Sequence, residues 1–135
     1  DEQAIRQVID NFLRSYERQD EDGCLAHMSS EKPFMFFGTN SNEVFTSPKE
    51  LRPVFAKDFR TMTDIQWGEY RHFSALGSSN LAQVLMELPL TFTVQGKKQD
   101  GIFRFSFALK KEKNQWKICL AMGSIPQAPE TYSLQ

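Results

Sequence analysis

Apolar positions in the first half of the chain recur every three or four residues, whereas those after Ile65 mostly alternate with polar ones. The first pattern is typical of helices that bury one face, and the second is typical of strands. The helical pattern predicts a helix over residues 1–18, a short helix over 24–28 and a third helix from 48 to about 61.

A capping signal marks the start of the third helix. Ser47 can cap the first turn, Pro48 suits the first helical position, and Glu50 completes a capping box. This combination of residues predicts that the chain turns into a helix at this point, directly after a brief strand.

The strand pattern predicts two brief strands, 34–37 and 44–46, before the third helix. Four long strands follow it, over residues 65–76, 81–95, 102–111 and 116–124, and the tail over 126–135 is expected to be extended. No repeat or linker interrupts this order. The chain is therefore predicted to form a single α+β domain over residues 1–135, with helices on a curved antiparallel sheet.

Turn positions give an estimate of how the long strands pair. Turns centred on Lys98-Gln99 and on Lys113 would place Thr93 opposite Arg104 and Arg104 opposite Met122. One face of the sheet is then mixed in character, with Glu87, Thr91, Thr93, Arg104, Ser106, Ile118, Leu120 and Met122. The other face is apolar, with Leu88, Leu90, Phe92, Phe103, Phe105, Phe107 and Leu109.

Helices can cover only one of these two faces. We expect them to enclose the mixed face and leave a pocket there, while the phenylalanine face meets a second subunit and forms a homodimer, because a monomer rarely exposes so large an apolar patch. The reverse assignment, with the phenylalanine face under the helices, stays open. A β-bulge in one of the strands would also exchange the faces.

The order of elements resembles the nuclear transport factor two-like superfamily, whose sheet forms a cone, and within it the SnoaL-like subgroup. The resemblance covers nearly all of the chain. Four segments carry it: Phe-Phe-Gly-Thr at 36–39 with Glu43 soon after, the helix entry at 47–51, Phe-Arg-Phe-Ser-Phe at 103–107, and Trp-Lys-Ile at 116–118 ending in Gly-Ser-Ile-Pro at 123–126.

The resemblance implies a cystatin-like cone with three N-terminal helices, but it assigns no single activity, because the family includes isomerases, cyclases, association domains and domains attached to signalling proteins. Members often carry polar residues, commonly His, near the end of the last strand, where this chain has Leu120 and Met122. The departure counts against acid–base chemistry of the family's kind. The chain begins without Met, which is compatible with its being part of a larger signalling protein.

Charge and composition exclude several functions. Sixteen basic and 17 acidic residues give a net charge of −1, which argues against a nucleic-acid surface. No apolar run is long enough to cross a membrane, and the two cysteines form no CxxC motif, which suits a reduced, cytoplasmic protein. The two histidines are not spaced as metal ligands, and we expect no metal or other cofactor.

Arg104 is the leading candidate for ligand contact, because a guanidinium between phenylalanines and inside a cone would need an anionic partner. Glu87 is a candidate general base. Alternatively, it forms an ion pair with Lys110, which the predicted register places opposite it on the neighbouring strand. The remaining candidate pocket residues are Ser106, Met122, Leu120, Trp67, Tyr16, Phe37 and Phe55. The leading interpretation is a small-ligand-binding or sensory domain with a mainly apolar pocket. The alternatives are an isomerase-like enzyme and a pure association module.

Overall fold

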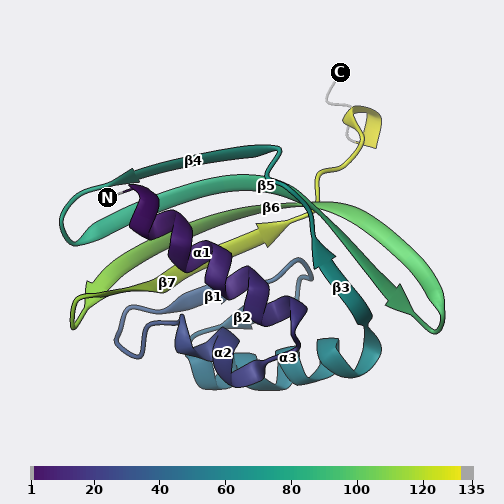
Figure 1. Ribbon diagram of the computed structural model, residues 1–135, viewed down its shortest axis with the longest axis horizontal. Helices are drawn as coiled ribbons and strands as arrows, with labels where there is room; N and C mark the ends of the chain where they lie inside the picture. The colour runs from purple at the N-terminus through teal and green to yellow at the C-terminus, as the bar shows by residue number, and fades with distance from the viewer. Residues whose placement is uncertain (1, 132–135) are drawn as a thin grey trace.

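The computed structural model describes residues 2–131 and has the predicted α+β architecture, in which a curved sheet arches over the helices (Figure 1). The helices are α1 (Glu2–Glu17), α2 (Glu21–Ala26) and α3 (Pro48–Thr61), followed near the end of the chain by the short 3-10 helix η1 (Pro129–Thr131). The predicted cone with three helices is confirmed.

Two helix starts differ from the sequence prediction. Asp20 begins α2 earlier than predicted, because its side chain accepts a hydrogen bond from the backbone N–H of Gly23 at 2.9 Å. At α3, Ser47 makes no side-chain cap; instead Glu50 reaches back to the backbone N–H of Thr46 at 2.7 Å and to its hydroxyl at 2.9 Å. The predicted start of α3 is correct, but the carboxylate of Glu50 performs the capping.

Seven strands form one sheet in the order β2-β1-β7-β6-β5-β3, and β4 pairs with the same edge of β5 as β3 does. Their bounds are β1 (Met35–Phe37), β2 (Val44–Phe45), β3 (Thr63–Trp67), β4 (His72–Gly77), β5 (Leu81–Val94), β6 (Lys97–Glu112) and β7 (Gln115–Ser124). The prediction of a purely antiparallel sheet is wrong in one place. β1 runs parallel to β7, so the sheet is mixed.

The expected single strand over 65–76 is divided into β3 and β4. Pro89 lies opposite the break, and it has no backbone N–H to offer to a neighbouring strand. A Cβ on Gly68 would lie 2.6 Å from Cγ of Pro89, so only glycine allows this close approach. The chain resumes pairing where the N–H of Arg71 donates to the carbonyl of Glu87 at 2.8 Å.

Two tight hairpin turns set the register of the long strands. Gln95 and Gly96 both have positive φ, at 51° and 78°, as do Lys113 and Asn114, at 50° and 64°. Two-residue turns of this kind match the twist of the flanking strands. The first turn is therefore tighter than the expected loop centred on Lys98-Gln99, and β6 begins at Lys97.

The tight turns change the predicted pairs. Glu87 lies opposite Arg104, not Lys110, and Arg104 lies opposite Ser124 in β7. The register of β5 against β6 moves by an even number of residues, so the predicted grouping of side chains into two faces on these strands is unchanged. The irregularity between Ala108 and Leu109 adds one residue in β7 at Cys119, and this bulge turns Ile118 to the apolar face.

The helices cover the phenylalanine face, so the expected inside and outside of the sheet are exchanged. Phe107 is 0% exposed and packs edge-to-face on Phe12 of α1, whereas Met122 is 51% exposed. Stacked contacts between Phe103, Phe105 and Phe107 continue this apolar row along β6. The prediction that the phenylalanine face meets a second subunit is therefore wrong. The apolar stripes of the helices gain most when buried against the more apolar face.

Candidate functional site

A cavity of about 250 Å³ lies between the sheet and the helices. It runs from exposed residues of the loop after β1, Thr39 and Asn40, to buried residues of the core such as Leu51. Its walls are rich in aromatic rings: Phe12, Tyr16, Phe36, Phe45, Phe55, Trp67, Phe92, Phe103 and Phe105. The face that sequence reasoning placed outside thus supplies much of the cavity wall.

The polar end of the cavity is made by Tyr16 of α1 and Asp58 of α3. The Tyr16 hydroxyl donates to Oδ2 of Asp58 at 2.8 Å. Burial raises the pKa of the Asp58 carboxyl, against the opposing effect of this hydrogen bond, and burial together with the neighbouring Asp58 charge raises the pKa of Tyr16. The ring of Tyr16 also packs against the rings of Phe55, Phe59 and Trp67, and these contacts help to hold the side chain in place.

Trp67 of β3 contributes a second polar group. Its ring lies edge-on to Phe103 and Phe105 in the cavity wall. Its backbone N–H is satisfied by Glu17 at 2.7 Å, but the indole Nε1 is buried and has no hydrogen-bond partner among the described residues. A buried donor without an acceptor costs on the order of 1–3 kcal/mol. A ligand with a hydrogen-bond acceptor would remove this cost.

The charged groups of the lining are both acidic. Glu43 and Asp58 line the cavity, and no Lys, Arg or His does so among the described residues. Glu43 is anchored by the backbone N–H of Asn40, which donates to Oε1 at 2.8 Å. The cavity therefore disfavours an anionic ligand, and its aromatic walls suit an apolar body or a cation.

The structure divides the nine predicted site residues between the two sides of the sheet. Tyr16, Phe55 and Trp67 line the inner cavity. The other six lie on the outer face, away from the helices: Arg104, Ser106, Met122, Leu120, Phe37 and Glu87. The prediction that Arg104 meets a ligand anion inside the cone is wrong, because Arg104 points to the outer side and is bound to Glu87.

Sequence reasoning missed Asp58 and Arg71. Asp58 stands three positions after Phe55 and seven after Leu51, on the buried stripe of α3, and a carboxylate on an apolar stripe was the available signal. Arg71 gave no such signal, because it reaches Glu87 only through the irregular segment that follows β3. That segment is specified by Pro89, which is distant in sequence.

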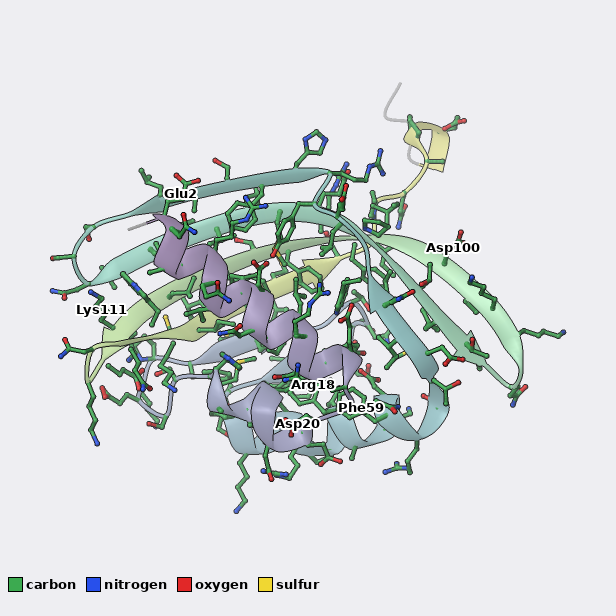
Figure 2. The ribbon with its side chains drawn as sticks, viewed as in Figure 1. Glu2, Arg18, Asp20, Phe59, Asp100 and Lys111 are labelled. Atoms are coloured by element: carbon green, nitrogen blue, oxygen red, sulfur yellow. The ribbon has the colours of Figure 1, made fainter. Side chains whose placement is uncertain are left out.

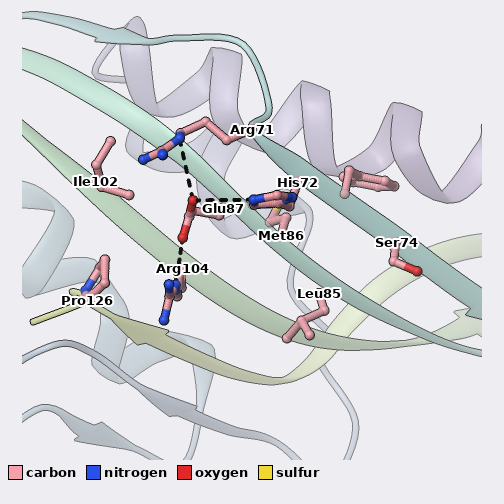
Figure 3. A pocket seen from close by; sticks show the side chains of 10 residues that line it. Arg71, His72, Ser74, Leu85, Met86, Glu87, Ile102, Arg104 and Pro126 are labelled. Atoms are coloured by element: carbon pink, nitrogen blue, oxygen red, sulfur yellow. Dashed lines mark hydrogen bonds and ion pairs between the residues drawn. The ribbon is translucent and has the colours of Figure 1, made fainter. Parts of the chain in front are cut away.

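On the outer face, two arginines converge on one carboxylate (Figure 3). Arg104 Nε donates to Oε1 of Glu87 at 2.7 Å, and Arg71 Nε lies 3.5 Å from Oε2. His72 Nε2 is 3.9 Å from the same Oε2. The hydrogen bond from Arg104 is the main cause that lowers the pKa of Glu87. The Glu87 side chain is little exposed, whereas the side chains of Arg71 and Arg104 are each about half exposed.

The sequence profile of the SnoaL-like domain matches residues 5–128. The chain belongs to the SnoaL-like domain family. No curated protein matches it in sequence. Among the residues that the structure describes, no group of three or more His, Cys, Asp or Glu is arranged to hold a metal ion, and no helix has the length and apolar character to cross a membrane.

Solved structures similar to this SnoaL-like domain show the same fold at low sequence identity. A nuclear transport factor 2-like superfamily protein from Salmonella enterica serovar Typhimurium has a TM-score of 0.82 and 16% identity, with 94% of this chain and 92% of that chain covered. A calcium/calmodulin-dependent protein kinase II association domain from Xanthomonas campestris has a TM-score of 0.79 and 19% identity, with 94% and 87% covered. A ketosteroid isomerase-like protein from Erwinia carotovora atroseptica has a TM-score of 0.76 and 19% identity, with 93% and 95% covered.

Proposed function

We propose that this SnoaL-like domain binds a small, mainly apolar ligand in the inner cavity, through a polar group that is neutral or positively charged. The observation that carries the proposal is that Trp67 lines the cavity and has a buried indole N–H with no acceptor among the described residues. At about 250 Å³ the cavity is slightly smaller than the sites of drug-sized ligands, which span roughly 300–1,000 Å³.

The charge of the lining narrows the class of ligand further. A carboxylate or phosphate would face Glu43 and Asp58 without a cation to balance it. A ketone or ether oxygen could accept from Trp67, and an ammonium group could pair with Asp58 while its apolar part contacts the rings. Ligands of these two kinds fit the chemistry of the walls.

Three probes of similar size separate these possibilities: acetophenone is neutral, benzylamine is cationic and benzoate is anionic. We expect acetophenone to shift the indole N–H resonance of Trp67, with Trp67→Phe weakening binding about three- to ten-fold, the usual contribution of one neutral hydrogen bond. Trp116→Phe is the matched control, because Trp116 is also buried but lies outside the cavity. Benzylamine binding should depend on Asp58. If none of the probes moves the Trp67 resonance, the proposal fails.

An enzyme is the second candidate, and Asp58 is the observation that favours it. Its carboxyl is partly buried next to an apolar cavity, its pKa is raised by burial, and a tyrosine hydroxyl lies 2.8 Å away. A carboxylate in such a place can remove a proton from carbon next to a carbonyl and return one from solvent. The test is exchange of the methyl protons of acetophenone in D₂O. Exchange that Asp58→Asn abolishes would support an isomerase-like enzyme, and exchange at the buffer rate would exclude this role for Asp58.

We also infer a homodimer, through the outer face of the sheet rather than the phenylalanine face. The outer patch consists of exposed apolar side chains: Met35, Phe37, Leu85, Leu120 and Met122. Register places Phe37 of β1 beside Met122 of β7, and it places Ser106 of β6 between Met122 and Leu85 of β5. Exposed apolar side chains grouped in this way mark contact sites. The unpaired, buried Cys24 and Cys119 support a reduced, cytoplasmic location.

A further inference from the structure

We propose that Arg71 and Arg104 form a second binding site on the outer face of the sheet, which takes the carboxylate of a small organic anion. The site lies in an open groove of about 780 Å³ and is independent of the inner cavity, from which the sheet separates it. The groove contains all four groups of the outer cluster: Arg71, His72, Glu87 and Arg104 (Figure 3).

The two arginines use only part of their hydrogen-bonding capacity. Each contacts Glu87 through Nε, and within the described part of the chain neither guanidinium has a further partner at its terminal Nη atoms. The side chains are 54% exposed at Arg71 and 58% exposed at Arg104, so solvent reaches them. The Nη groups therefore remain free to donate to an incoming oxyanion.

Glu87 fixes the two arginines without neutralising both. One carboxylate stands against two guanidinium groups, which leaves an excess of one positive charge before His72 is counted. Anchoring by Nε also reduces the side-chain freedom that each arginine would lose when it binds an anion. A pair of guanidinium groups held in this way suits a carboxylate, which can accept two hydrogen bonds at once.

The position of the cluster follows from the fold. His72, Glu87 and Arg104 stand in one row across β4, β5 and β6, and the irregular segment after β3 brings Arg71 back onto Glu87. Half-buried Ile102 and Pro126 line the groove beside the charges. These side chains provide contact for an apolar body next to the carboxylate, which favours an organic acid over a bare inorganic ion.

Benzoate is the probe, and benzamide is the neutral probe of the same shape. We expect benzoate to shift the Nε–H resonances of Arg71 and Arg104 in a nitrogen-15 spectrum, without shifting the indole resonance of Trp67. Arg71→Gln should weaken benzoate binding about ten-fold or more, since one charge-assisted hydrogen bond is lost. Arg104→Lys should weaken it as well, because it keeps the charge but not the planar fork.

Arg71→Gln removes an exposed side chain and retains the 2.7 Å pair between Arg104 and Glu87, so we expect that variant to fold normally. Arg60→Gln, an exposed change at the end of α3, is the control that removes the same charge elsewhere.

Three results would overturn the proposal: equal binding of benzoate and benzamide, equal loss of benzoate affinity in Arg60→Gln and Arg71→Gln, or benzoate affinity that disappears as protein concentration rises. The last result would show that a second copy of the chain occupies the groove. The inner cavity is tested separately by acetophenone and Trp67, so either proposal can fail alone.

Discussion

The Tyr16 hydroxyl and the Asp58 carboxylate, 42 positions apart in sequence, join α1 to α3 through a hydrogen bond of 2.8 Å beside the inner cavity. This bond holds the polar end of the cavity in place. The Asp58 carboxyl is partly buried, where the charged form is costly, and its pKa is raised for that reason.

Asp58→Asn is expected to stabilise the domain at neutral pH. The folded-state pKa of Asp58 lies above its ordinary value of 3.8, so the folded protein loses stability as pH rises through the folded pKa, and the loss is complete above it. Asparagine carries no charge and still offers an oxygen to Tyr16. Urea unfolding across pH should show a more stable variant at pH 7 and a shrinking difference as pH falls toward 3.8.

Asp100→Asn is the control for this comparison. Asp100 is exposed on β6, near the hairpin at the opposite end of the strand from Lys111 (Figure 2). A stability gain of the same size in both variants would mean that a general charge effect, and not the burial of Asp58, is responsible.

Phe107→Ala and Met122→Ala test which face of the sheet the helices cover. Phe107 is fully buried against Phe12, so its truncation is expected to cost about 3–5 kcal/mol. Met122 is half exposed, and its truncation should change the monomer by no more than about 0.5 kcal/mol. Unfolding by urea at protein concentrations that keep the chain monomeric measures both. A larger loss at Met122 than at Phe107 would contradict the arrangement of the sheet.

Glu87→Gln is expected to flatten the acid side of the stability profile. The hydrogen bond from Arg104 lowers the pKa of Glu87 below its ordinary value of 4.5. A depressed carboxyl pKa contributes stability that is present above pH 4.5 and is lost as pH falls through the folded pKa. Thermal unfolding between pH 7 and pH 3 should therefore show a smaller decline in the variant. The idea fails if the two proteins decline in parallel.

Leu120→Glu combined with Met122→Glu is expected to keep the chain monomeric. Both side chains are exposed in the outer patch, and two carboxylates there would be placed against apolar surface in a dimer. Sedimentation velocity at high micromolar concentration gives the mass of each species. The control is Ser79→Glu combined with Gln99→Glu, which adds the same charge at exposed turn and hairpin positions. A wild-type chain that is monomeric under these conditions would contradict the proposed homodimer.

The sequence alone determined the order of the elements and the residues that share a face of β5 and β6. Alternation places Glu87, Arg104 and Ser106 together whichever way the sheet turns, and the start of α3 was predicted correctly at Pro48. These features are local, because strand period, proline and capping residues act within a few positions of the chain.

Only the tertiary structure decided which face is inside. Alternation is the same for both sides of a sheet, and the choice depends on where the apolar stripes of distant helices gain most from burial. Because the helices cover the phenylalanine face, Phe105 lies in the cavity wall and Arg104 lies on the other side of the sheet. The added residue at Cys119 and the break opposite Pro89 are likewise pairing effects between strands. They turned Ile118 inward and brought Arg71 to Glu87.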